Sequence, residues 1–114
     1  MPYIKTTVSN EISPAAQEAL KTKLGQAIAL ILGKTERWLM LEFQDNARMY
    51  FQGGNGADYA FVQVSLFGGA SDAAYDRLTA AISEILNEEL AIDRANIYIT
   101  YQPLEHWGWN GSNF

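Results

Sequence analysis

The sequence predicts an α+β fold: a tandem βαβ repeat forming one four-stranded mixed sheet, with two antiparallel helices on one of its faces. Three observations indicate this fold. Apolar residues recur 58 positions later in the chain, as Ile4 does at Val62, so the sequence contains two similar copies. Within each copy the spacing of apolar residues changes from two, as in a strand, to about 3.6, as in a helix, and back again. Each copy also carries a residue suited to cap the N-terminus of a helix. At 114 residues the chain fits a single domain, 1–114, with repeats at about 2–45 and 58–103.

The internal repeat rests on apolar positions that coincide without a gap when the second half of the chain is placed on the first. The segment 13–16 falls on 71–74, and both segments begin with serine. A constant register over roughly 40 positions favours two copies of one unit. The aligned pairs are Ile4 with Val62, Val8 with Leu66, Leu20 with Leu78, Leu24 with Ile82, Ile28 with Leu86, Leu32 with Leu90, Leu39 with Ile97, Leu41 with Ile99 and Phe43 with Tyr101.

The first repeat has the pattern of strand, helix and strand. Residues 3–8 alternate between apolar and polar side chains, as a half-buried strand does. Ser13 suits an N-cap, Pro14 suits the first helical turn, and we expect Gly33 to end the helix. Residues 38–44 form the second predicted strand. The stripe expected to face the core consists of Leu20, Leu24, Ile28 and Leu32.

The second repeat follows the same order. We expect a strand over 58–67, a turn at Gly68-Gly69, a helix capped by Ser71 and a closing strand over 96–102. A strand–helix–strand crossover is right-handed and makes its two strands parallel, so the two units together give a mixed sheet with both helices on one face. The expected core stripe of this helix is Leu78, Ile82, Ile85, Leu86 and Leu90.

The opposite face of the predicted sheet has no layer to cover it. A partly apolar bare face and unpaired strand edges both favour association, so we predict a closed homo-oligomer. The segments 48–51 and 107–114 lie outside the repeat, and we expect them to be short edge strands that bridge subunits. The side chains expected on the bare face are Tyr3, Lys5, Thr7, Leu39 or Met40, Phe61 and Gln63.

Composition excludes several classes of function. The chain carries 8 Lys plus Arg against 13 Asp plus Glu, a net charge of -5, which argues against a nucleic-acid partner. It has no cysteine and a single histidine, His106, so disulfides, thiolate chemistry, a metal site and a Ser-His-Asp triad all lack support. No stretch is long and apolar enough for a membrane span, and Met1 to Lys5 lack a signal-peptide core, so we expect a cytoplasmic protein with no membrane partner.

Pro2 is the residue with distinctive chemical potential. Removal of Met1 would expose a secondary amine at the start of a strand. A free α-amine titrates near pH ~8, and burial or a nearby cation lowers that pKa toward neutrality, where the amine becomes a competent general base. The alternative is a proline that is merely tolerated at the chain terminus.

Five segments of the chain form a specific combination of motifs. They are Met1-Pro2 leading into a strand, Leu32-Gly33-Lys34, Phe67-Gly68-Gly69, the run from Arg94 to Tyr101, and the ending from Trp107 to Phe114, WGWNGSNF. Together these segments resemble the macrophage migration inhibitory factor (MIF) family of the tautomerase superfamily, over essentially the full length. The resemblance implies a homotrimer of βαβ-βαβ protomers, with active sites between neighbours and residues 104–114 as an inter-subunit tail.

The resemblance also implies an activity: cofactor-free keto-enol tautomerisation of small aromatic keto or enol acids, phenylpyruvate-like and dopachrome-like. Pro2 matches the catalytic base, and Lys34 matches the cation that holds the substrate's carboxylate or carbonyl oxygen and helps keep Pro2 neutral; alternatively, Lys34 is a lysine favoured at a helix C-terminus. Val64 matches a backbone N–H donor, Tyr98 a pocket tyrosine from the neighbouring subunit, and Thr100 a family asparagine. The residues matching the pocket wall or its surroundings are Trp38, Leu104, Trp107, Trp109 and Phe114.

Three departures from the family pattern change what the resemblance implies. The family's CxxC is absent from 56–59, which excludes a thiol oxidoreductase activity. Thr100 removes an amide donor, and Trp107 replaces a smaller aliphatic residue, so we expect altered substrate preference with an intact proton-transfer apparatus. The alternative function is a MIF-like cytokine or binding protein with a weak or vestigial pocket, a protein receptor and export without a signal peptide.

Overall fold

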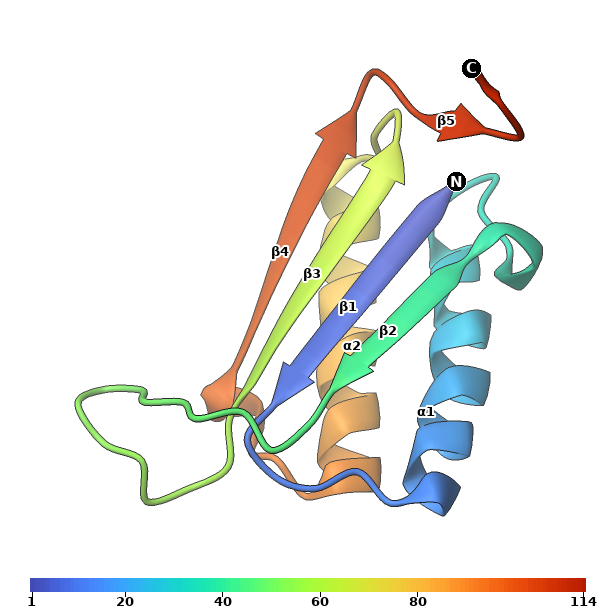
Figure 1. The fold of residues 1–114 in the computed structure, drawn as a ribbon. Helices are drawn as coiled ribbons and strands as arrows, with labels where there is room; N and C mark the ends of the chain where they lie inside the picture. Colours follow the sequence, from blue (N-terminus) through green and yellow to red (C-terminus); the bar gives the residue numbers. More distant parts are fainter.

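The computed structural model describes all residues from Met1 to Phe114. Its secondary structure follows the predicted order of strand, helix and strand, twice, before a short C-terminal hairpin (Figure 1). The elements are β1 (Pro2–Val8), α1 (Pro14–Ala27), η1 (Ile28–Leu30), η2 (Glu36–Trp38), β2 (Met40–Gln44), β3 (Ala60–Phe67), α2 (Asp72–Leu90), η3 (Arg94–Asn96), β4 (Ile97–Leu104), β5 (Gly108–Trp109) and β6 (Ser112–Asn113).

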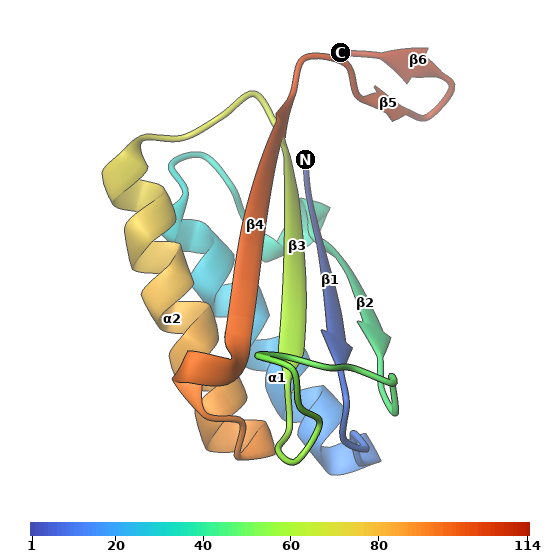
Figure 2. The same ribbon diagram turned by 90° about the vertical axis from the view of Figure 1, so that its left-hand side faces the viewer.

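The sheet confirms the predicted fold class. Its strand order is β2-β1-β3-β4, with β1 parallel to β2, β3 parallel to β4, and the central pair β1 and β3 antiparallel. Both helices cover one face of this sheet (Figure 2). The alternation in β1 places Ile4, Thr6 and Val8 toward the helices and leaves the side chains between them on the other face. No helix of the chain has both the length and the apolar character needed to cross a membrane.

Both predicted N-caps are present. The Ser13 hydroxyl accepts a hydrogen bond from the backbone N–H of Ala16, and the Ser71 hydroxyl accepts one from Ala74, each at 3.1 Å. Pro14 occupies the first turn of α1, where its missing N–H leaves no helical hydrogen bond unmade. These local signals therefore set the starts of both helices.

The end of the first helix differs from the prediction. The α-helix stops at Ala27, tightens into η1 and becomes extended at Ile31, which has φ -89° and ψ 119°. The tighter turn shifts the side-chain phase, so Ile31 is 1% exposed and Leu32 is 97% exposed. The expected core position of Leu32 is therefore wrong, and Gly33, with φ +82°, lies in the following connection instead of ending the helix.

The predicted strands are shifted by one to two residues at several ends. Trp38 belongs to η2, and β2 begins only at Met40, because a 3-10 turn precedes the strand. Leu39 packs against the core while Met40 is on the open face, 68% exposed, which decides between the two residues expected there. The strand predicted from residue 58 starts at Ala60.

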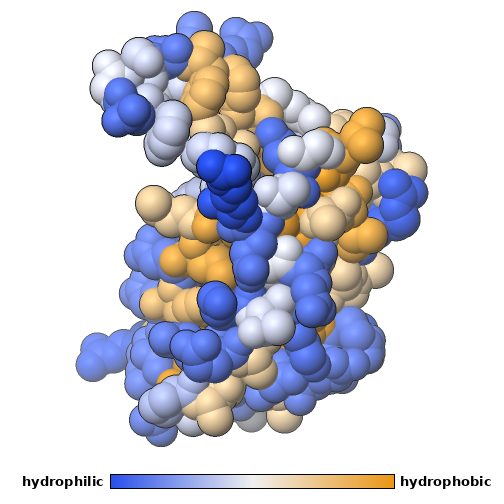
Figure 3. All heavy atoms as spheres, turned by 90° about the vertical axis from the view of Figure 1, so that its right-hand side faces the viewer, coloured by the Kyte–Doolittle hydropathy of each residue, from blue (hydrophilic) through white to orange (hydrophobic).

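The two segments expected as bridging edge strands form local structure within the protomer. Residues 48–51 form no strand, although Phe51 and Gly54 exchange two backbone hydrogen bonds. Residues 107–114 contain the paired strands β5 and β6, a hairpin that extends from the end of the sheet on the side away from the helices (Figure 2). The rest of that face has no covering layer, as predicted. The side of the molecule formed by α1 and β2 shows hydrophobic patches among hydrophilic residues (Figure 3).

We expect the two adjacent residues Ile31 and Leu32 to respond oppositely to truncation. Ile31→Ala removes a fully buried side chain and should lower the free energy of unfolding by about 2 to 5 kcal/mol. Leu32→Ala removes an exposed side chain and should change that free energy by no more than about 0.5 kcal/mol. Urea-induced unfolding at one fixed protein concentration measures both. A larger loss for Leu32→Ala than for Ile31→Ala would contradict the observed end of α1.

Candidate active site

The N-terminus is fixed at one end of the central strand pair. Pro2 is buried and lies opposite Leu66 in the antiparallel register of β1 and β3. The carbonyl of Met1 accepts a hydrogen bond from the backbone N–H of Phe67 at 3.0 Å. Strand pairing therefore holds the first two residues beside the turn that follows β3.

Lys34 reaches this N-terminal end from the connection after η1. Its backbone N–H donates to the carbonyl of Ile31 at 3.0 Å, which folds the connection back on itself. Its ammonium donates to the carbonyl of Phe67 at 2.9 Å, the residue whose N–H holds Met1. The Lys34 charge is thus placed next to the amine of the chain.

This environment changes the titration of the N-terminal amine. Burial, followed by the positive charge of Lys34 and a hydrogen bond with its side chain, lowers the pKa of the Met1 amine from its usual 8.0 to about 6. The charged form of the amine loses solvation and is repelled by the neighbouring ammonium. At neutral pH the amine is therefore mostly uncharged and able to accept a proton.

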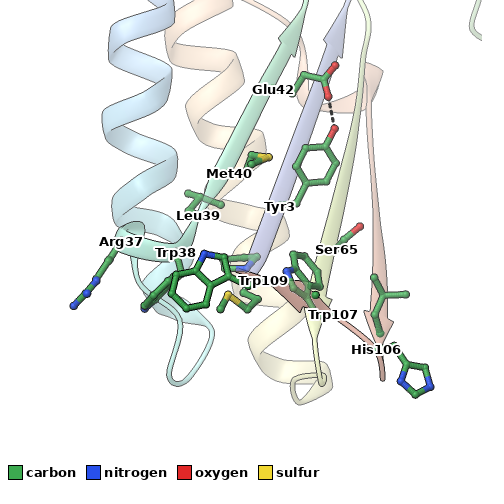
Figure 4. Close-up of a pocket in the computed structure, with 14 residues that line it drawn as sticks. Tyr3, Arg37, Trp38, Leu39, Met40, Glu42, Ser65, His106, Trp107 and Trp109 are labelled. Atoms are coloured by element: carbon green, nitrogen blue, oxygen red, sulfur yellow. Dashed lines mark hydrogen bonds between the residues drawn. The ribbon is translucent and has the colours of Figure 1, made fainter. Parts of the chain in front are cut away.

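The amine opens into a cavity of about 980 Å³ with aromatic walls. The rings of Trp38 and Trp109 meet edge to face, with centroids 5.1 Å apart and an interplanar angle of 87°. Figure 4 shows these two rings together, with Trp107 nearby. The lining residues are Met1, Pro2, Tyr3, Arg37, Trp38, Leu39, Met40, Glu42, Ser65, Leu104, His106, Trp107, Gly108 and Trp109.

The C-terminal residues tie the hairpin to the sheet at the same end. Phe114 stacks on Trp109, with centroids 6.4 Å apart and an interplanar angle of 10°, and packs against Phe67 at 5.6 Å. The backbone N–H of Phe114 also donates to the carbonyl of Trp107 at 3.0 Å. Phe114 does not line the cavity itself; it supports a tryptophan that does.

Several lining residues were not predicted from the sequence. The Tyr3 hydroxyl donates to Glu42 across the strands, and this hydrogen bond is the main cause that raises the pKa of Tyr3. The guanidinium carbon of Arg37 lies 5.0 Å from the centroid of the Trp38 ring. The alternation of β1 and β2 puts Tyr3 and Glu42 on the open face, but only the register of the two strands brings them together.

Besides Phe114, the lining of this cavity leaves out Lys34, which lies beside the amine, and three more predicted site residues. Val64 is 1% exposed, its side chain belongs to the core, and its role as a backbone donor stays a prediction. Tyr98 and Thr100 lie on the open face of β4, where Tyr98 is opposite Phe61 of β3. Pro2 is opposite residue 66 of β3, five residues further along, so Tyr98 and Pro2 are about 16 Å apart along one sheet.

Tyr98 instead belongs to a second aromatic cluster at the far end of the open face. Its ring meets Phe51 edge to face at 5.0 Å and Phe61 at 6.5 Å. Tyr59 packs on Phe51 in turn, at 6.1 Å. Because Tyr98 is still 57% exposed, the cluster presents an aromatic surface that a second molecule can contact.

The arrangement supports acid–base chemistry on a small organic molecule. It offers an uncharged amine and three tryptophans around a single cavity, with the Lys34 cation beside the amine. An amine of this pKa can remove a proton from carbon, and a nearby positive charge stabilises the oxygen anion that results. No group of three or more His, Asp or Glu side chains gathers in a way that would hold a metal ion.

Comparisons with known proteins agree with this geometry. The family model described as macrophage migration inhibitory factor (MIF) matches residues 1–114. A crystal structure of MIF2 from Leishmania major is 32% identical, covers 100% of this chain and 97% of its own, and has a TM-score of 0.92. The MIF homologue from Prochlorococcus marinus is 27% identical, with coverage of 98% of each chain and a TM-score of 0.86.

More distant structures share the fold. The Toxoplasma gondii protein described as macrophage migration inhibitory factor is 24% identical, covers 98% of this chain and 99% of its own, and has a TM-score of 0.90. A sequence comparison with curated proteins gave no significant match. Because the family model spans the whole chain and a solved relative exceeds 30% identity over the whole of this chain, this chain belongs to the macrophage migration inhibitory factor family.

Proposed function

We propose that this chain is a cofactor-independent keto-enol tautomerase of phenylpyruvate-like and dopachrome-like compounds, with the amine of Pro2 as its general base. Membership of the family supports a tautomerase or MIF-like function in general. One observation carries the specific proposal: the N-terminal amine lies in the aromatic cavity, with a pKa lowered to about 6 by burial and by Lys34.

Removal of Met1 makes Pro2 the N-terminal residue in this account. Pro2 also lines the cavity, one residue further into β1, so we expect burial and the Lys34 charge to lower the pKa of its exposed nitrogen in the same direction as that of the Met1 amine. The neutral nitrogen takes a proton from the carbon next to the substrate carbonyl and returns it at the oxygen, or the reverse. The proton is conserved, so the reaction needs no oxidant or reductant.

The intermediate of this reaction is an enolate, whose negative charge has to be stabilised. The Lys34 ammonium, fixed by its hydrogen bond to Phe67, is the cation placed for that task. The rings of Trp38, Trp107 and Trp109 offer faces against which a planar substrate can stack. A positioned base of suitable pKa contributes on the order of 100-fold to 10,000-fold in rate.

The complete site is proposed to form in a homotrimer. Within one protomer, Tyr98 is at the opposite end of the sheet from Pro2, so it can join a Pro2 site only when it comes from another copy. The uncovered open face and the exposed aromatic cluster around Tyr98 supply surfaces for that contact. The family resemblance gives the number of copies as three.

The alternative is a MIF-like binding or signalling role with a vestigial pocket and a protein receptor as partner. Receptor binding alone gives no reason for an amine that is buried beside a cation and opens into a tryptophan-lined cavity. The enzyme is therefore the favoured function.

Changing the N-terminal amine should remove most of the activity. We expect Pro2→Gly, and separately a chain extended by one alanine before Pro2, to lower kcat/KM by about 100-fold or more, because the base is altered or displaced. The assay follows tautomerisation of phenylpyruvate and of a dopachrome methyl ester, with Lys21→Ala as a surface control. Equal rates for wild type and both altered N-termini would refute the Pro2 mechanism.

The pH profile should report the amine and its dependence on Lys34. The neutral amine is the active form, so kcat/KM should fall as pH drops through a pKa of about 6. Lys34→Met removes the charge and the hydrogen bond but keeps the amine buried. The pKa that sets the acid limb of the kcat/KM profile should therefore rise toward the usual 8.0. An acid limb at the same pH in both proteins would show that Lys34 does not control the base.

Mixing two defective variants tests whether Tyr98 acts from a neighbouring subunit. Co-expression of Pro2→Gly chains with Tyr98→Phe chains in equal amounts should restore activity at about a quarter of the sites, those with an intact Pro2 beside an intact neighbouring Tyr98. Sedimentation velocity should show a trimer for each variant. Activity no greater than the mean of the two separate variants, or a monomeric wild type, would contradict the shared site.

A further inference from the structure

The connection from β3 to α2, residues 68–71, lies at the end of the sheet that carries the N-terminus (Figure 2). It begins with two glycines, and Gly68 has φ +80°, a conformation that favours glycine. Two glycines give a segment many backbone conformations, so contacts with other elements have to select one. The site depends on this choice, because the Phe67 carbonyl at the start of the connection accepts the hydrogen bond of the Lys34 ammonium.

One peptide group links the connection to both β4 and Lys34. The carbonyl of Phe67 and the N–H of Gly68 belong to the same planar trans peptide, so they point in opposite directions and turn together. The N–H of Gly68 donates to the carbonyl of Leu104 at 2.8 Å. Rotation of this peptide would therefore break the contact with β4 and turn the Phe67 carbonyl away from Lys34.

Tyr75, in the first turn of α2, holds the other end of the connection. Its hydroxyl oxygen accepts a hydrogen bond from the backbone N–H of Ala70 at 3.2 Å. Neither Gly69 nor Ala70 takes part in a hydrogen bond between backbone groups, so this hydroxyl is their anchor. A Cβ added to Gly69 would lie 3.7 Å from the same hydroxyl and 3.6 Å from Cβ of Pro103, which shows that the connection packs between α2 and β4.

The ring of Tyr75 is itself fixed by β4. It packs on the ring of Tyr101, with centroids 4.5 Å apart and an interplanar angle of 36°. The Tyr101 hydroxyl donates to the carbonyl of Tyr75 at 3.2 Å and forms a hydrogen bond with the hydroxyl of Thr79 at 2.7 Å. Two tyrosines thus stack side by side, and only the hydroxyl of Tyr75 reaches the connection.

We propose that Tyr75 is a positioning residue of the active site. By anchoring the connection after β3, its hydroxyl keeps the Phe67 carbonyl turned toward Lys34 and so keeps the Lys34 ammonium beside the N-terminal amine. Tyr75 does not line the cavity, so it acts on the amine through the connection and Lys34. This inference rests on the proposed function, in which Lys34 keeps the amine neutral.

An NMR titration of the Pro2 nitrogen in Tyr75→Phe, in ¹⁵N-proline protein that has lost Met1, tests this role. The variant keeps the ring that packs on Tyr101 and loses only the acceptor for the Ala70 N–H. Once the connection is released, Lys34 is held less firmly beside the amine. The pKa of the amine should therefore rise by about 0.5 or more above wild type, toward the usual 8.0, and the acid limb of kcat/KM should follow it.

Tyr101→Phe is the matched control. It removes a hydroxyl from the same pair of rings, but neither hydrogen bond of that hydroxyl reaches the connection. It should leave the pKa of the amine within about 0.2 of wild type, because Lys34 stays in place. Thermal unfolding measures how far each variant lowers stability. An equal rise of the amine pKa in both variants would assign the effect to general loosening of the fold and overturn the proposal.

Combination with Lys34→Met tests whether Tyr75 acts through Lys34. Without the cation, adding Tyr75→Phe should change the pKa of the amine by no more than about 0.2, since the two residues belong to one chain of contacts. A rise as large as the one in the presence of Lys34 would show that Tyr75 acts on the amine by another route, which would contradict the proposal.

The outcomes separate this inference from the proposed function. An amine pKa that stays at the wild-type value in Tyr75→Phe refutes the positioning role. A raised pKa in Tyr75→Phe, together with a wild-type protein that has no tautomerase activity, would refute the proposed function and leave the positioning role standing. An active tautomerase whose amine pKa does not depend on Tyr75 would do the opposite.

Discussion

The pairing of β1 with β3 determines where the candidate active site forms, because it joins the two βαβ units and places the N-terminus at one end of the two central strands. Seven consecutive pairs, from Pro2 opposite Leu66 to Val8 opposite Ala60, fix this register. The same pairing brings Met1 to the backbone of Phe67, whose carbonyl in turn holds Lys34. A lowered amine pKa is thus a consequence of sheet register, since burial and the cation both follow from it.

The fold class was predictable because its signals are local and occur twice. Ser13 and Ser71 cap helices through hydrogen bonds to residues three positions further along the chain, which do not depend on tertiary structure. The alternation of apolar and polar residues in a strand determines which of its faces is buried. The end of α1 was not predictable in this way. Periodicity assigns Leu32 to the core, but a switch to 3-10 geometry after Ala27 rotates that position outward and gives its place to Ile31.

The residues of the candidate site that belong to a sequence motif were predictable. The residues that meet only through tertiary packing or strand register were not. The resemblance singled out Pro2 and Lys34, and the structure brings both to one end of the sheet. It gave no indication of Arg37, whose position over Trp38 depends on how η2 packs, or of the contact between Tyr3 and Glu42, which needs the strand register. One protomer accordingly contains two surfaces, a tryptophan-lined cavity and an aromatic cluster, at opposite ends of its open face.

The central claim is that the terminal proline amine is a neutral base at physiological pH. Its most direct test is an NMR titration of the Pro2 nitrogen in protein that carries ¹⁵N-proline and has lost Met1. The account predicts a pKa near the value of about 6 that this environment gives the Met1 amine. A pKa at the ordinary value near ~8 would contradict it, since the amine would then be mostly protonated and unable to take a proton from the substrate.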